Sequence, residues 1–217
     1  FTALKHLFFH NMNKNYWERY YSEKLGTLEP SSFSIKILKF ITQGETVLEL
    51  GCGNGRDSFY FANNGIRVIA VDQSKNIINR IKKENVNPTF LCMDIADIQE
   101  NFNYKVNHCY ARFFFHALDN DEENSAIKLI TNILPKNGYF FSESRSIKSS
   151  LYGKGEFFSK DIYSTNHKRR FIRKDNFIEK LKHNGFQIES IIESDGLAIF
   201  ENDDPVVIRI CAKKTEN

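Results

Sequence analysis

The sequence has 217 residues and a mass of 25.3 kDa, which corresponds to one domain of ordinary size with room for a small lid. Thirty Lys and Arg residues against 27 Asp and Glu residues give a net charge of +3, which excludes a strongly basic nucleic-acid-binding protein. Twenty Phe, nine Tyr and one Trp are too many aromatic residues for a disordered chain, and no apolar stretch reaches the ~20 residues of a membrane span.

From residue 44 onward, apolar runs alternate with amphipathic stretches. This alternation predicts βαβ units, and therefore an α/β fold with a Rossmann-like, mostly parallel sheet and helices on both faces. No helix separates the last two strands, so we expect them to pair antiparallel. The expected strands are 46–50, 67–71, 89–93, 106–111, 138–142, 187–194 and 205–212, and the expected helices are 56–64, 75–84, 120–134 and 175–184.

Two segments fall outside this alternation. Residues 1–40 are predicted to form a helical lid segment, and residues 41–217 the main domain, with a cap insertion around 144–174. Met12 is a candidate natural start, which would make residues 1–11 an upstream extension without a functional role. We expect no secretory signal, because no charged segment followed by an apolar one opens the chain.

The pattern of cysteines indicates the cellular compartment. They form no CxxC pair and have no histidine at metal-ligand spacing, so we expect reduced thiols, no metal site and a cytoplasmic location. The four residues are Cys52, Cys92, Cys109 and Cys211.

The strongest chemical signal is a glycine-rich loop, Glu49-Leu-Gly51-Cys-Gly53-Asn-Gly55-Arg-Asp57, which follows a strand and opens a helix. Asp72 ends the next strand, where a carboxylate can accept both hydroxyls of a ribose. A dinucleotide-binding loop requires glycine at the position that Arg56 occupies here, and the Glu49 carboxylate would repel a pyrophosphate. An NAD-dependent oxidoreductase is therefore disfavoured. A nucleoside with a ribose diol and an ammonium-bearing tail, such as S-adenosylmethionine, meets both demands.

The run VLELGCGNGRD with VDQS downstream resembles motif I and the acidic loop of class I S-adenosylmethionine-dependent methyltransferases. The resemblance implies an enzyme with a seven-stranded sheet whose last strand is antiparallel, and S-adenosylhomocysteine as product. Glu49 stands where Asp is usual in that family, and the Asn/Asp-Pro-Pro-Tyr motif of nucleic-acid amino-methylating enzymes is missing. The implied cofactor-binding residues are Glu49, Gly51, Cys52, Gly53, Asn54, Gly55, Arg56, Asp72, Gln73, Ser74, Met93, Asp94, Ile95, Tyr110 and Ala111.

A basic run in the expected cap predicts the chemistry of the methyl acceptor. Five of the seven residues from 168 to 174 are basic, in a chain that is otherwise balanced. The run is either a solvated face before a helix or a clamp for a phosphate or carboxylate, which arginine binds in bidentate fashion. The expected acceptor-binding residues are Arg112, Arg145, His167, Arg169 and Arg170, with Tyr16, Tyr20 and Tyr21 from the N-terminal helix.

Three residues are candidates for a catalytic role. His116 and His167 are possible general bases, and Arg112 would orient the acceptor at the end of the fourth strand. For each histidine, a structural role in packing is the competing interpretation. The aromatic stripe of Tyr16, Trp17, Tyr20 and Tyr21 likewise serves either as packing or as a lid that excludes water.

A narrower resemblance concerns the segments GCGNGRDS, DQS, YARFFFHAL, ESRS, HKRRFI and DPVVIR. Together they are similar to small methyltransferases of bacterial surface-polysaccharide gene sets, including those associated with capsular O-methyl phosphoramidate. We therefore expect O-methylation of a small anionic metabolite, with no nucleic-acid or membrane partner. Two alternatives stay open: methylation of a neutral metabolite with a histidine base, and a non-catalytic subunit that binds S-adenosylmethionine.

Overall fold

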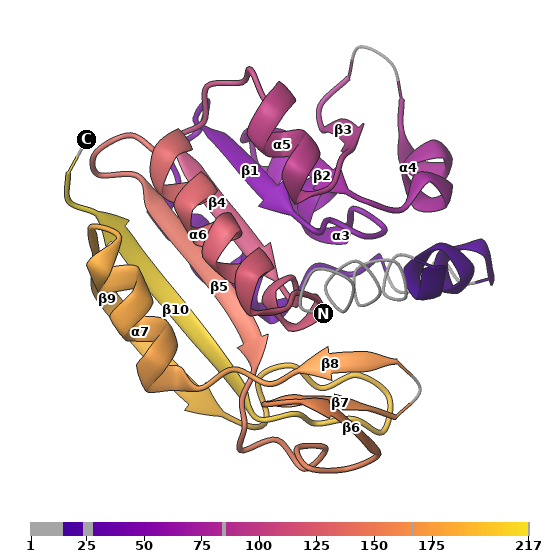
Figure 1. Cartoon of the computed structure of the whole chain (residues 1–217). Helices are drawn as coiled ribbons and strands as arrows, with labels where there is room; N and C mark the ends of the chain where they lie inside the picture. Colours follow the sequence, from indigo (N-terminus) through magenta and orange to yellow (C-terminus); the bar gives the residue numbers. More distant parts are fainter. Residues whose placement is uncertain (1–14, 24–27, 84–85, 166, 217) are drawn as a thin grey trace.

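The computed structural model describes residues 15–23, 28–83, 86–165 and 167–216. Its centre is a seven-stranded sheet with the strand order β3-β2-β1-β4-β5-β10-β9 (Figure 1). The strands are β1 Thr46–Leu50, β2 Arg67–Asp72, β3 Thr89–Cys92, β4 His108–Arg112, β5 Tyr139–Arg145, β9 Phe186–Ser194 and β10 Val207–Lys214.

Strand direction follows from the connections. β1 pairs in parallel with β2 and β4, and β10 pairs antiparallel with both β5 and β9. Parallel neighbours require a crossover, which the helices between β1 and β5 supply, whereas β9 and β10 follow one another without a helix. The predicted α/β fold, with a mixed sheet and an antiparallel last strand, is confirmed.

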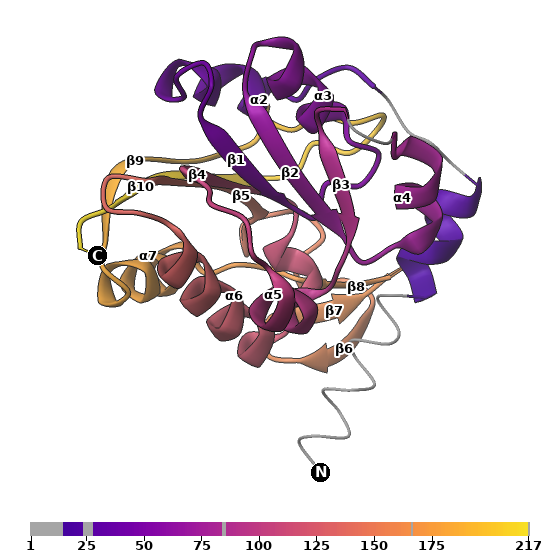
Figure 2. The ribbon, with the colours of Figure 1, turned by 90° about the horizontal axis from the view of Figure 1, so that it is seen from above.

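Helices cover both faces of the sheet (Figure 2). One apolar core lies under α5, α6 and α7, and it includes the buried Ile98, Ile127 and Leu181. The second core lies under α2, α3 and α4, with Phe33, Phe61 and Ile77. The helices are α2 Ser32–Ile37, α3 Arg56–Asn63, α4 Lys75–Ile81, α5 Ile95–Asn101, α6 Asn120–Ile133 and α7 Lys174–His183, with short 3-10 turns η1 Leu38–Phe40 and η2 Phe115–Ala117.

Two elements were missed in the sequence. α5 follows β3 directly and begins with a capping box between Asp94 and Asp97. The cap segment contains a small antiparallel sheet of three strands, whose three or four residues each are too few to establish a periodic pattern. These strands, the cap sheet, are β6 Glu156–Ser159, β7 Ile162–Ser164 and β8 Lys168–Arg170.

Residues 15–23 form a helix, the aromatic helix, which is bound to the first turn of α4. The Glu18 carboxylate accepts hydrogen bonds from the N–H groups of Lys75 (2.7 Å) and Asn76 (3.1 Å). Arg80 donates to the Tyr21 carbonyl at 2.6 Å. In the helical lid segment expected over 1–40, residues 15–23 and 32–37 are helical, and residues 1–14 and 24–27 lie outside the described residues.

Candidate active site

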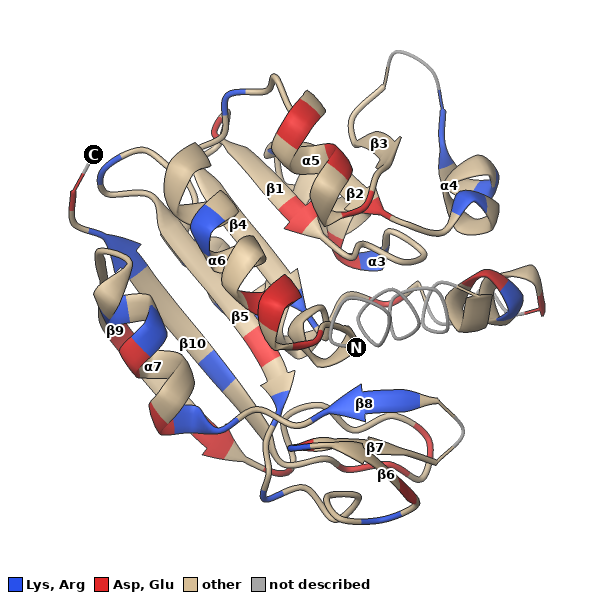
Figure 3. Cartoon of the chain, viewed as in Figure 1, with Lys and Arg blue, Asp and Glu red and all other residues tan. Residues whose placement is uncertain are grey.

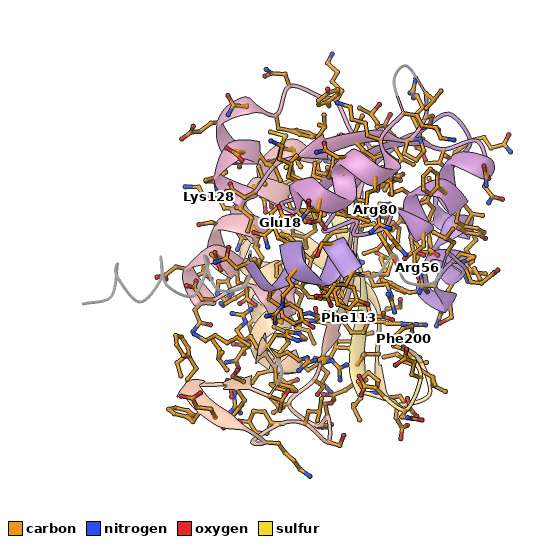
Figure 4. The ribbon with its side chains drawn as sticks, turned by 90° about the vertical axis from the view of Figure 1, so that its right-hand side faces the viewer. Glu18, Arg56, Arg80, Phe113, Lys128 and Phe200 are labelled. Atoms are coloured by element: carbon orange, nitrogen blue, oxygen red, sulfur yellow. The ribbon has the colours of Figure 1, made fainter. Side chains whose placement is uncertain are left out.

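A cavity of about 1160 Å³ lies at the carboxyl ends of the parallel strands. This is the edge at which open α/β sheets bind ligands, because loops after neighbouring strands converge there. The aromatic helix and the cap sheet close its sides, and Phe113 and Phe200 lie between them (Figure 4). Its walls include most of the predicted site: Glu49, Gly51, Cys52, Gly53, Asn54, Arg56, Asp72, Gln73, Met93, Asp94, Ile95, Arg112, His116, Arg145, His167, Arg169, Tyr16, Tyr20 and Tyr21.

The glycine loop has the backbone that its sequence predicts. Gly51, Gly53 and Gly55 have φ angles of 70°, 52° and 74°, in the left-handed region that favours glycine. At Gly53, a side chain would collide with the Tyr21 hydroxyl, so the loop and the aromatic helix approach as closely as glycine allows. The loop therefore contributes backbone to the cavity wall, with the Tyr21 hydroxyl packed directly against it.

Asp72 connects the loop to the end of β2. Its carboxylate accepts hydrogen bonds from the N–H groups of Gly53 and Ser74, both at 2.9 Å. Burial raises the pKa of Asp72, and these two donors partly offset the effect. A carboxylate held rigidly at this edge retains lone pairs for the hydroxyls of a ribose.

Glu49 lines the cavity at the same end as the glycine loop and Asp72. It is buried, and its carboxylate accepts a hydrogen bond from the Ser58 hydroxyl. Burial and the nearby Asp57 raise the pKa of Glu49 well above its usual value. An ammonium group beside it would reverse that shift, so the donor set suits a cationic tail.

The opposite end of the cavity is basic. Arg112 pairs with the buried Glu143 at 2.7 Å, and Arg145 pairs with Asp203. Arg169 donates to the Thr165 hydroxyl at 2.8 Å, and no carboxylate within the described residues forms an ion pair with it. Burial and the charge of Arg145 lower the pKa of Arg169 to about 10, which leaves the guanidinium charged at neutral pH.

Two histidines lie among these arginines. His116 is buried, and neither of its ring nitrogens has a hydrogen-bond partner in the part of the chain that the structure describes. Burial and the surrounding cations lower the pKa of His116 well below its usual value and that of His167 to about 3. Both imidazoles are therefore neutral at neutral pH.

The basic run forms β8 and part of the segment that leads from it to α7 (Figure 3). Strand alternation points its side chains in different directions. In β8, Arg169 faces the cavity, whereas Arg170 points to the other side and forms a buried ion pair with Glu123 of α6. Arg173 pairs with Asp161 at 2.7 Å. The expectation that Arg170 binds the acceptor is corrected, because its guanidinium is used to attach the cap to α6.

The structure also keeps four expected cofactor residues out of the cavity wall. The Tyr110 side chain is fully buried in the core, where its hydroxyl lies 2.8 Å from Asp57. Ala111 is buried in the other core. Gly55 precedes α3, and Ser74 caps α4 through the N–H of Ile77. These residues shape the site from behind and do not line it.

Sequence reasoning missed one wall of the cavity. The flap, residues 195–206 between β9 and β10, contributes its residues 198–203. Ile199 and Phe200, apolar side chains within an acidic loop, were the available signal. Phe113 and Phe114, which follow β4, also line the cavity, and a Cβ at Gly51 would lie 3.1 Å from Phe114.

Comparisons with known proteins agree with this geometry. Residues 47–138 match the family model described as a methyltransferase domain. Residues 47–138 therefore form an S-adenosylmethionine-dependent methyltransferase domain. The matched segment contains the glycine loop, Asp72 and the end of β4, where the sequence predicts cofactor binding.

Individual relatives cover different shares of this methyltransferase. The probable S-adenosyl-L-methionine-dependent methyltransferase TehB of Haemophilus influenzae is 34% identical over 128 residues, 56% of this chain and 43% of that protein. A cypemycin N-terminal methyltransferase of a Streptomyces species is 31% identical over 100 residues, 45% of this chain and 41% of that protein. The chain thus spans about two fifths of these curated relatives. A solved S-adenosylmethionine-dependent methyltransferase of Methanosarcina mazei shares the fold, with a TM-score of 0.70 at 14% identity over 84% of this chain and 98% of that one.

S-adenosylmethionine is the methyl donor of this methyltransferase domain, and the residues present fit it. Gly51 and Gly53 contribute backbone to the cavity wall, Asp72 offers a carboxylate for the ribose, and Glu49 offers a carboxylate for the ammonium group. The described residues contain no group of three or more His, Cys, Asp or Glu side chains placed to hold a metal ion. Among the helices described, none has the length and apolar character needed to cross a membrane.

Proposed function

We propose that this methyltransferase transfers the methyl group of S-adenosylmethionine to an oxygen of a small anionic acceptor. The observation that supports the proposal is Arg169, a charged guanidinium in the cavity wall without a carboxylate partner among the described residues. Burying such a charge is costly unless a counter-charge arrives, and an anionic acceptor supplies one.

The polarity of the cavity supports the same assignment. Carboxyl groups gather at the glycine-loop end, at Glu49 and Asp72, and cations at the cap end, at Arg145 and Arg169. A cofactor with an ammonium group and a ribose suits the first end, and an anion suits the second. The two ligands would therefore meet in the middle, beside Arg112 and His116.

An anionic oxygen also fits the state of the histidines. When bound, the sulfonium of the cofactor supplies the methyl group and the leaving group. An oxygen that already carries negative charge needs no base, so neutral His116 and His167 would donate hydrogen bonds and orient it. A phosphate, phosphoramidate or nucleotide-linked sugar has this chemistry, and a surface-polysaccharide intermediate stays a prediction.

One observation favours a second candidate, methylation of a neutral metabolite at oxygen or nitrogen. Among the described residues, no hydrogen-bond partner contacts either ring nitrogen of His116 at the cavity wall, as a general base would need before its substrate binds. The name of the Streptomyces relative refers to methylation of an N-terminus.

Matched arginine variants distinguish the candidates. The assay follows S-adenosylhomocysteine formation with phosphate, phosphoramidate and nucleotide-sugar acceptors and with uncharged counterparts of each. For an anionic acceptor, Arg169→Ala is expected to raise KM by roughly tenfold or more, since a charge-assisted bidentate contact is lost. Arg173→Ala, in the same basic run but paired with Asp161, is expected to leave KM unchanged. Equal turnover of the uncharged counterparts, unaffected by Arg169→Ala, would contradict the proposal.

A further inference from the structure

The flap brings a carboxylate into the basic end of the cavity. Asp203 contacts the guanidinium of Arg145 at two points, one of which is Nη1–Oδ1 at 3.3 Å. The Asp203 side chain is 40% exposed, whereas that of Arg145 is only 9% exposed. The arginine therefore belongs to the cavity wall, and its partner lies at the solvent side.

The other ion pair of the cavity is built differently. Glu143 lies within β5, is completely buried and is bound by both Arg112 and Arg209. Two guanidiniums and a strand backbone hold that carboxylate, so an incoming anion has no means of replacing it. Asp203 has one guanidinium partner and lies on a connecting loop, so it is replaceable.

The flap has a fixed base and a separate tip. At the base, the Leu197 carbonyl accepts hydrogen bonds from Arg209 (2.7 Å) and Ser32 (2.9 Å). At the tip, Phe200 and Asp203 exchange two backbone hydrogen bonds of 2.9 Å, which makes residues 200–203 one tight turn. Any movement of Asp203 away from Arg145 therefore moves Phe200 as well.

The tip also carries exposed apolar side chains. Ile199 and Phe200 are 65% and 46% exposed although both line the cavity. Contact with a bound acceptor would bury part of this surface, which favours a tip position over the acceptor.

We propose that Asp203 determines acceptor specificity: its carboxylate occupies the anion position on Arg145 before an acceptor binds, and a sufficiently anionic acceptor displaces it. This inference deepens the proposed function and rests on it. Displacing Asp203 from Arg145 costs free energy, and this cost lowers the apparent affinity of every acceptor. A neutral acceptor cannot replace the lost ion pair, so it is rejected. An acceptor with two negative charges engages Arg145 and Arg169 together and releases the tip carrying Phe200.

Titration with inorganic pyrophosphate, with S-adenosylhomocysteine at saturation, tests this inference by calorimetry. Asp203→Asn is expected to bind pyrophosphate roughly fivefold or more tightly than the wild type, because a competing charge-assisted pair is removed. Asp204→Asn is the matched control: it removes the same charge from the neighbouring flap residue, which is not among the described residues that line the cavity, and its amide oxygen can still accept the hydrogen bond from the Gly196 N–H. Its affinity should stay within about twofold of the wild type.

Arg169→Ala separates the two proposals. If it weakens pyrophosphate binding while Asp203→Asn brings no gain, the role of Asp203 is overturned and the anion site stands. Equal gains in Asp203→Asn and Asp204→Asn would also overturn that role, because the effect would then be general electrostatics. If neither the wild type nor Asp203→Asn binds pyrophosphate, both proposals fail. A gain in affinity cannot arise from misfolding, so the expected result is not open to that explanation.

Discussion

The ring of Tyr16 stacks on the imidazole of His167, with 4.2 Å between ring centroids and 25° between planes. This contact joins the aromatic helix to the cap, while Tyr21 of the same helix reaches the glycine loop at Gly53. The helix therefore connects the cofactor end of the cavity to the acceptor end.

Loss of this stacking should loosen the helix. Tyr16→Ala is expected to shift Trp17 emission to longer wavelength, because Trp17 also contacts His167 and would become hydrated. Trp17 is the single tryptophan of the chain, so its fluorescence reports on this helix directly. Tyr104→Ala, at an exposed position away from the cavity, should leave the spectrum unchanged. An unaltered spectrum in Tyr16→Ala would contradict this role.

Glu18 should hold the same helix from its other side. Glu18→Gln weakens charge-assisted hydrogen bonds to the first turn of α4, at a cost of about 1 kcal/mol. Hydrogen exchange of residues 15–23 is expected to become several times faster, by roughly fivefold for that free energy. Glu23→Gln, an exposed change on the same helix, is the control. Equal exchange in both variants would show that Glu18 does not anchor the helix.

Neighbouring arginines of β8 should have opposite phenotypes. Arg170→Ala breaks a buried ion pair and is expected to lower the free energy of unfolding by about 3 kcal/mol. The loss is not larger because Lys180 still contacts Glu123. Arg169→Ala should change that free energy by less than about 1 kcal/mol, because its guanidinium has no carboxylate partner among the described residues. Urea denaturation of both variants measures the difference, and equal losses would contradict the assignment of Arg170 to structure.

Asp57 should be essential to folding. Its carboxylate accepts four hydrogen bonds, from the Ser31 N–H (2.7 Å) and from the hydroxyls of Ser31, Ser34 and Tyr110. Asp57→Ala leaves these buried donors unsatisfied, and we expect a loss of about 3 kcal/mol or more. Tyr110→Phe removes only one of the donors and should cost about 1 kcal/mol in the same denaturation assay. Similar small losses in both variants would contradict the network.

His167 should make the stability of the protein depend on pH. The pKa of His167 is lowered to about 3 in the folded protein, so the unfolded chain binds a proton first as the pH falls. The contribution of His167 to the free energy of unfolding is therefore complete above pH ~6.5. It is lost between pH ~6.5 and 3, at about 1.4 kcal/mol per pH unit.

The raised pKa values of Glu49 and Asp72 act in the opposite direction, so the test is the difference between wild type and His167→Asn. Between pH 6.5 and 4.5, this difference in unfolding free energy should shrink by about 1.4 kcal/mol per pH unit, measured by denaturation at each pH. A difference that is constant with pH would contradict a buried, neutral His167.

Sequence reasoning succeeded where the signal was local. The glycine loop and Asp72 are fixed by spacing within one βαβ unit, so their approach could be predicted. Arg169 and Arg170 could not be separated, because the three-residue strand that points them in opposite directions has no periodic signal. Tyr110 was expected to bind the cofactor, but strand alternation, set by tertiary pairing, turns its side chain into the core. The Asp203 contact depends on a loop conformation that no pattern encodes.

The most direct test of the account is calorimetric titration of S-adenosylmethionine into the wild type, Asp72→Ala and Asp175→Ala. We expect micromolar binding by the wild type, a loss of roughly tenfold or more in Asp72→Ala because a ribose-binding carboxylate is removed, and no change in Asp175→Ala, on α7. Absence of binding by the wild type, or equal binding by wild type and Asp72→Ala, would contradict the assignment of this cavity to the cofactor.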